Sequence, residues 1–189
     1  ILFPTKFIGL SRDIMSVFSA HEVSHALYSP EDFSEEFKKY GPHVMMVLED
    51  CRTENKIKAD FVGLSAMFER GYKSLAYDHD FFGFKKHNID FDSLSLIDRI
   101  NIKAKIGVNV DVPFTPEELE FFNRAMSTET WEDVIELAIE YNENWSSSSE
   151  KEESESNSDL EDIIRVFSSP FALSGFFFSA IFPSFIIGF

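Results

Sequence analysis

The sequence predicts a mainly α-helical, zincin-like domain over residues 1–145, an acidic linker over 146–165 and an apolar tail over 166–189. Two observations predict the helical class. Apolar residues recur every three or four positions through most of the first 145 residues, and helix-start signals precede several of these runs. Residues 106–112 are the one candidate for a small residual strand, and a loop is the alternative there.

The first predicted helix runs from Ile14 to Leu27. Ser11 supplies a capping hydroxyl and Asp13 an acid in the first turn. The run contains no glycine or proline, and Pro30 ends it.

Five further helices are expected. Pro42 suits the first position of a helix that continues to Lys58. A third covers Asp60 to Leu75, interrupted or begun near Gly63, with its core positions at Phe61, Leu64, Met67 and Phe68. The remaining segments are Phe91–Lys105, a helix from Thr115-Pro116 to Met126, and a last helix capped by Ser127 or Thr128 that reaches about Trp145.

The stretch His21-Glu22-Val23-Ser24-His25 carries the clearest chemistry. Residues four apart share one helix face, so His21 and His25 can hold one Zn²⁺. Glu22 can reach a water on the open side of that ion and take its proton. The alternative is a helix with two buried, hydrogen-bonded histidines.

Catalytic zinc usually takes a third protein ligand, and we expect Glu49 to supply it. Asp50 could accept the outer N–H of a ligand histidine, and Arg52 could orient a carboxylate. A structural network of Glu49, Asp50 and Arg52 that joins two helices is the alternative.

His79 and His87 are the other candidates for the third ligand, in a segment that resembles a loop. A hydrogen-bond donor near the metal would stabilise a tetrahedral oxyanion. His43 and Tyr72 are candidates for this donor, with Tyr40 and Tyr77 as alternatives.

Four elements together resemble a known family. They are AHEVSHALYSP (20–30), VLEDCRTENKIKADFVGL (47–64), a Phe-Phe-Gly element and Ile97–Asn101. The pattern resembles the peptidase-like domain of von Willebrand factor A-containing metallopeptidases, which are similar to cobalt-chelatase subunits and occur in tailed bacteriophages among other sources. The resemblance implies ligands His21, His25 and Glu49, the base Glu22, and an AAA+ ATPase and a von Willebrand factor A domain as partners.

Charge and cysteine content bound the function further. The net charge is −16, and residues 129–165 hold 13 acidic against 2 basic residues. Nucleic-acid binding needs a basic face, so we expect none. The single cysteine, Cys51, cannot form an internal disulfide and fits a reducing compartment. We therefore expect the cytoplasm, or the host cytoplasm if the protein is viral.

The linker and the tail differ sharply in composition. Residues 146–159 are almost all Ser and Glu, a composition typical of disorder. Residues 166–189 carry no charge and eight phenylalanines. A shifted reading frame, a membrane anchor and a hydrophobic docking tail are the three interpretations.

The sequence thus predicts a zinc metallopeptidase that cleaves a peptide or protein substrate. A non-catalytic adaptor with a structural metal, and a membrane-tethered form of either, are the alternatives.

Overall fold

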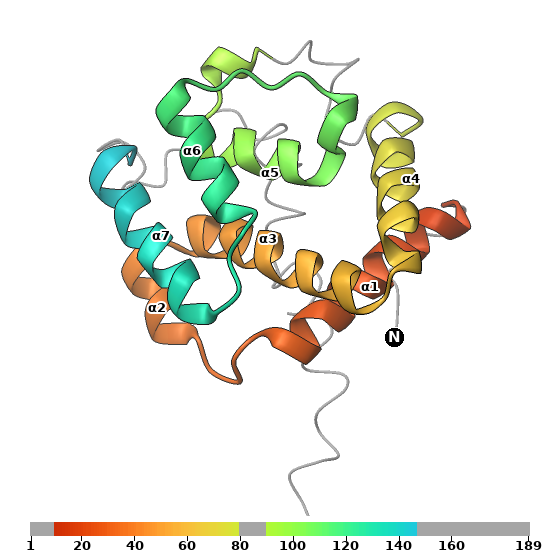
Figure 1. Cartoon of the computed structure of the whole chain (residues 1–189), viewed down its shortest axis with the longest axis horizontal. Helices are drawn as coiled ribbons and strands as arrows, with labels where there is room; N and C mark the ends of the chain where they lie inside the picture. Colours follow the sequence, from red (N-terminus) through yellow and green to blue (C-terminus); the bar gives the residue numbers. More distant parts are fainter. Residues whose placement is uncertain (1–9, 80–89, 147–189) are drawn as a thin grey trace, which may run out of the picture.

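The computed structural model describes residues 10–79 and 90–146 and confirms the mainly helical class. Within these ranges the chain forms no strand. The candidate strand at residues 106–112 is instead the end of a helix, a 3₁₀ turn and a stretch of coil. The α-helices of these ranges are α1 (Arg12–Tyr28), α2 (Ser34–Tyr40), α3 (Pro42–Asp60), α4 (Gly63–Tyr77), α5 (Leu96–Ile106), α6 (Pro116–Ala125) and α7 (Trp131–Asn144), with 3₁₀ turns at Phe91–Ser93 and Gly107–Asn109 (Figure 1). The predicted tail and all but the first residue of the linker lie outside the described residues.

Helix α3 is the central element, and every other α-helix of the described ranges packs against it (Figure 1). A helix surrounded in this way is expected to be apolar on all sides. However, its middle is polar and buried. The polar residues buried there are Glu49, Asp50, Arg52, Thr53 and Glu54. Buried side chains stay charged only when they are paired, so these residues are expected to form a network of hydrogen bonds and ion pairs.

Apolar cores lie on both sides of that polar segment. The larger core joins α3 to α2, α5, α6 and α7, and it includes Leu48, Phe121 and Tyr141. The second core joins α1 to α4 and to the last turns of α3. Gly71 lets α1 and α4 approach closely, because a Cβ there would lie 2.3 Å from Val17 Cγ2. The two cores fix α1 beside the polar segment of α3.

Capping residues explain most helix starts. Ser11 caps α1 as predicted, and Thr115 caps α6 in a capping box with Glu118. The prediction for α7 was wrong: Thr130, and neither Ser127 nor Thr128, accepts from the first turn, in a second capping box with Asp133. Thr128 donates instead to the Ala125 carbonyl at the end of α6.

The placement of Phe61 also corrects a prediction. Phe61 was expected in the core, but it is 54% exposed because it lies in the turn between α3 and α4, outside the apolar face of α4. It lines an open groove of about 500 Å³ on the outer face of α1, with Met15, Val23 and Met67. This groove and the two predicted ligand histidines, His21 and His25, occupy different faces of α1.

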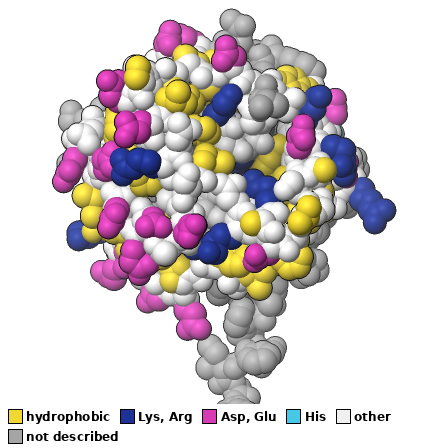
Figure 2. All heavy atoms as spheres, in the orientation of Figure 1, with side chains coloured by type: hydrophobic (Ala, Val, Ile, Leu, Met, Phe, Trp, Pro, Cys, Tyr) yellow, Lys and Arg dark blue, Asp and Glu magenta, His cyan; other side chains and the backbone are white. Residues whose placement is uncertain are grey.

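The surface charge is uneven. Figure 2 shows acidic side chains gathered on the side where α2 and α7 lie. Helix α7 alone contributes five acidic residues and no basic one. No helix in residues 10–79 and 90–146 is long and apolar enough to cross a membrane.

Candidate metal centre

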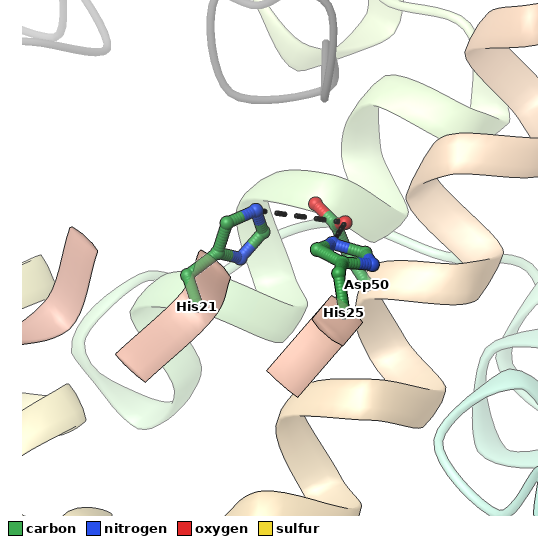
Figure 3. A group of neighbouring side chains, drawn as sticks. All are labelled: His21, His25 and Asp50. Atoms are coloured by element: carbon green, nitrogen blue, oxygen red, sulfur yellow. Dashed lines mark hydrogen bonds and ion pairs between the residues drawn. The ribbon is translucent and has the colours of Figure 1, made fainter. Parts of the chain in front are cut away.

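His21 and His25 project from one face of α1 toward α3. They stand one helical turn apart, and their ring centroids are 4.8 Å from each other. Figure 3 shows both rings directed at the same carboxylate. His21 is only 6% exposed, so its imidazole is held inside the protein.

The carboxylate between the rings belongs to Asp50. Its Oδ1 lies 3.0 Å from His25 Nε2 and 3.9 Å from His21 Nε2. One ligand atom from each of the three residues lies within 4.8 Å of the other two. His21, His25 and Asp50 could therefore hold a metal ion (Figure 3).

Glu49, the predicted third ligand, is placed elsewhere. Arg52 binds it through two bonds, Nε to Oε2 at 2.8 Å and Nη2 to Oε1 at 2.7 Å. Ser29 Oγ also donates to Oε1 at 2.6 Å. Consecutive helix residues point about 100° apart, so Asp50 faces the rings while Glu49 faces the end of α1. In the structure Asp50, and not Glu49, thus lies between the two rings.

Both outer ring nitrogens have acceptors. His21 Nδ1 lies 3.0 Å from Glu54 Oε1, and a carboxylate only accepts. His25 Nδ1 lies 3.0 Å from Ser29 Oγ, whose own proton goes to Glu49. Both protons therefore sit on Nδ1 in the neutral rings, and both Nε2 lone pairs point inward.

This assignment leaves three acceptors facing one another. With both rings neutral and protonated on Nδ1, the two Nε2 atoms and Asp50 Oδ1 would converge without a hydrogen between them. Such an arrangement requires a cation or an added proton. Burial lowers the pKa of His21, but Asp50 and Glu54 outweigh it and raise that pKa overall, so the two carboxylates favour the positively charged ring.

Lys105 closes the far side of the cluster. It extends from α5, and its Nζ donates to Asp50 Oδ2 at 2.7 Å and lies 3.7 Å from Glu54 Oε1. Burial alone would raise the pKa values of both acids, but Lys105 and His21 hold that of Asp50 well below its usual range and bring that of Glu54 to about 2. Both carboxylates are therefore ionised at neutral pH.

Glu22 lies beside His21 on α1 and is partly buried. Its Oε1 is buried and has no hydrogen-bond partner among the described residues. Burial raises the pKa of Glu22, although the two neighbouring histidines act in the opposite direction. The carboxylate thus lies near the candidate ligands, and its buried oxygen forms no hydrogen bond with the described residues.

The other predicted residues are not at the cluster. His43 bonds Asp98 on α5 through Nε2 at 2.7 Å, and His79 is exposed just after α4. Tyr72 is buried and donates its hydroxyl to Glu54, so it supports His21 from behind. His87 lies outside the described residues.

Three contributors were missed from the sequence: Ser29, Glu54 and Lys105. Glu54 follows Asp50 by four residues, and this spacing could have indicated a shared helix face. Ser29 lies four residues after His25 and offered the same signal. Nothing in the sequence around Lys105 links it to a site more than fifty residues earlier.

Comparison with known proteins gives no match. No family model, no curated protein and no solved structure matches this chain. The resemblance to von Willebrand factor A-containing metallopeptidases therefore stays a prediction, and the case for function depends on the geometry of the cluster.

Proposed function

We propose that the protein is a zinc-dependent hydrolase of the metallopeptidase type, with His21, His25 and Asp50 as the protein ligands. One observation carries the proposal: two ring nitrogens and one carboxylate oxygen converge in a buried place, and the outer nitrogen of each ring has a partner that can accept its proton. Two histidine nitrogens argue against a site built for calcium or magnesium, which prefer oxygen ligands.

The donor set suits zinc. Two imidazoles and one carboxylate are a common catalytic combination, and three protein ligands leave one position for water or substrate. Bound zinc would act as a Lewis acid toward a carbonyl oxygen and would make its water more acidic. Glu54 and Ser29 supply the outer hydrogen bonds that hold the rings of ligand histidines in place.

Glu22 is the candidate general base. It follows a ligand directly in the chain, so the helix fixes its position beside the cluster. Its buried Oε1 has no partner among the described residues, which leaves an oxygen able to accept a proton from the attacking water. The same carboxyl can then return that proton to the leaving amine.

Zinc analysis combined with a Glu22→Gln variant tests the proposal. We expect the purified protein to contain about one zinc per chain, and we expect wild type to cleave members of a quenched-fluorescent peptide library. The variant should keep its zinc and lose at least about 100-fold in rate, within the range typical of general-base removal. Metal-free protein that takes up no zinc would contradict the proposal.

A second candidate is a non-catalytic adaptor in which the metal is structural. The burial of the site favours it, since His21 and Asp50 are only 6% and 4% exposed. The acidic face over α7 would then serve a protein partner, such as the AAA+ ATPase implied by the family resemblance. Stoichiometric zinc together with no cleavage by wild type would favour this function.

A further inference from the structure

Lys105 is an unusual component for a metal centre. Its side chain is 2% exposed, and its amine touches Asp50, one of the proposed ligands, at 2.7 Å. Glu54, which supports His21, lies 3.7 Å from the same amine. Lysine is almost never buried to this degree unless it is paired, so its charge is specifically accommodated here.

The two acids need a positive charge. Asp50 and Glu54 lie one turn apart on α3, and their side chains are 5% and 4% exposed. Two buried carboxylates at so short a separation repel each other, and this repulsion opposes the ionisation of both. Among the described residues, Lys105 is the only lysine or arginine paired with Asp50, because Lys58 reaches only Glu54 Oε2 at 3.6 Å.

The two oxygens of the Asp50 carboxylate have different partners. Lys105 occupies Oδ2, whereas Oδ1 faces the two histidines. A metal bound at Oδ1 and an ammonium bound at Oδ2 would both be attracted by the same negative charge. Each cation therefore weakens the binding of the other by a free energy that a thermodynamic cycle can measure.

We propose that Lys105 is the internal counter-cation of the centre, which keeps the fold stable without metal and lowers the affinity for it. The inference rests on the proposed metal binding by His21, His25 and Asp50. It makes the site one that gains and loses its metal while the chain stays folded. In a purely structural zinc site the metal itself supplies much of the folding free energy.

Lys105→Met tests this directly, because methionine fills similar space without charge. Thermal unfolding is followed by circular dichroism after chelation and again with saturating zinc, and zinc affinity is measured by competition with a chromophoric chelator. We expect metal-free wild type to unfold cooperatively and zinc to raise its Tm modestly. In the variant the metal-free Tm should fall by roughly 10 °C and zinc should restore most of it. Its zinc affinity should rise about 10-fold or more, because the ammonium no longer competes with zinc for the charge of Asp50.

Lys103→Met is the matched control. Lys103 lies on the same helix, but its amine donates to the Val110 carbonyl and contacts neither acid in the structure. We expect this variant to keep the wild-type zinc affinity and the wild-type response of Tm to zinc. If Lys105→Met alone fails to fold, the double variant Lys105→Met/Asp50→Asn should recover part of the stability, because the carboxylate left without its amine is gone.

Failure of the inference and failure of the proposed function are distinguishable. If Lys105→Met binds zinc no more tightly than wild type, or keeps the wild-type Tm without metal, the inference is wrong while the metal site stands. If wild type and the variant both bind no zinc, the proposed function itself is wrong. Recovery by the double variant would then still identify Lys105 as the counter-ion of Asp50.

Discussion

Glu49 and Asp50 are neighbouring carboxylate residues on α3 and are buried to a similar degree, yet they belong to two different clusters. Glu49 joins Ser29 and Arg52 in an outer cluster, where every carboxylate oxygen receives a hydrogen bond from a donor. Asp50 joins the inner cluster of His21, His25, Glu54 and Lys105. There Oδ2 accepts a hydrogen bond from the Lys105 amine, and Oδ1 faces the Nε2 atoms of both histidines. The balance of donors and acceptors, and not burial, therefore separates the structural network from the candidate site.

Removal of Arg52 should have the largest effect. Besides Glu49, Arg52 donates to the carbonyl of Tyr28 at the end of α1 and to that of Glu129 before α7. Arg52→Met leaves a buried carboxylate unpaired, so we expect the free energy of unfolding to fall by about 3–5 kcal/mol. Urea unfolding of the metal-free protein measures this loss.

Lys56→Met is the control for that experiment. Lys56 also donates to the Glu129 carbonyl, but it is partly exposed and has no buried partner to leave behind. Its loss should change the free energy of unfolding by no more than about 0.5 kcal/mol. A loss below about 1 kcal/mol for Arg52→Met would show that the outer cluster is not the closed ion pair described above.

The exchange of roles between the two acids gives the next largest effect. Asp50→Asn removes a proposed ligand, and we expect zinc affinity to fall at least about 100-fold, or roughly 2.7 kcal/mol. Glu49→Gln changes only an outer partner and should cost about 10-fold. His79→Ala, at an exposed position after α4, should change nothing. The opposite order of Asp50 and Glu49 would restore the assignment expected from the sequence.

Local signals in the sequence were enough for much of the fold. The cap at Ser11, the proline at position 42 and the capping box at Thr115 each act within one turn, and each begins a helix where predicted. The cap of α7 was misplaced by two residues, since Thr128 and Thr130 offer the same hydroxyl. Only the position of Asp133 three residues later distinguishes Thr130.

For the candidate site too, the sequence predicted only what depends on local spacing. The spacing of His21 and His25 places both rings on one face whatever surrounds the helix. The choice between Glu49 and Asp50 depends on how α3 is rotated relative to α1. The packing of both apolar cores sets that rotation. Lys105 reaches the cluster only because α5 packs beside α3, and no local sequence pattern predicts that packing.

Ser29 is the one hydroxyl in the described part of the chain that links the two clusters. Its removal should have a smaller effect. Ser29→Ala deletes the acceptor for His25 Nδ1–H, so the ring loses the bond that fixes its tautomer. We expect zinc affinity to fall about 10-fold. Long-range ¹⁵N–¹H NMR of the metal-free protein should show the His25 proton no longer confined to Nδ1. Ser29→Thr keeps the hydroxyl and should keep both properties; equal losses in the two variants would mean that packing matters and not the hydrogen bond.

The smallest effect is expected from a pair that belongs to neither cluster. His43 and Asp98 join α3 to α5, with side chains 33% and 20% exposed, so water screens them more than the buried clusters. Burial alone would raise the pKa of Asp98, but hydrogen bonds from His43 and Ser95 outweigh it and hold that pKa below its ordinary 3.8. A lowered pKa in the folded state means that the carboxylate stabilises the protein above about pH 3.8, and that this contribution is lost as the pH falls through the folded value. Wild type should thus exceed Asp98→Asn by roughly 0.5–1 kcal/mol in urea unfolding at pH 7, and the two should converge toward pH 2. A gap that stays constant down to pH 2 would mean that the pair acts through shape and not through charge, unlike either buried cluster.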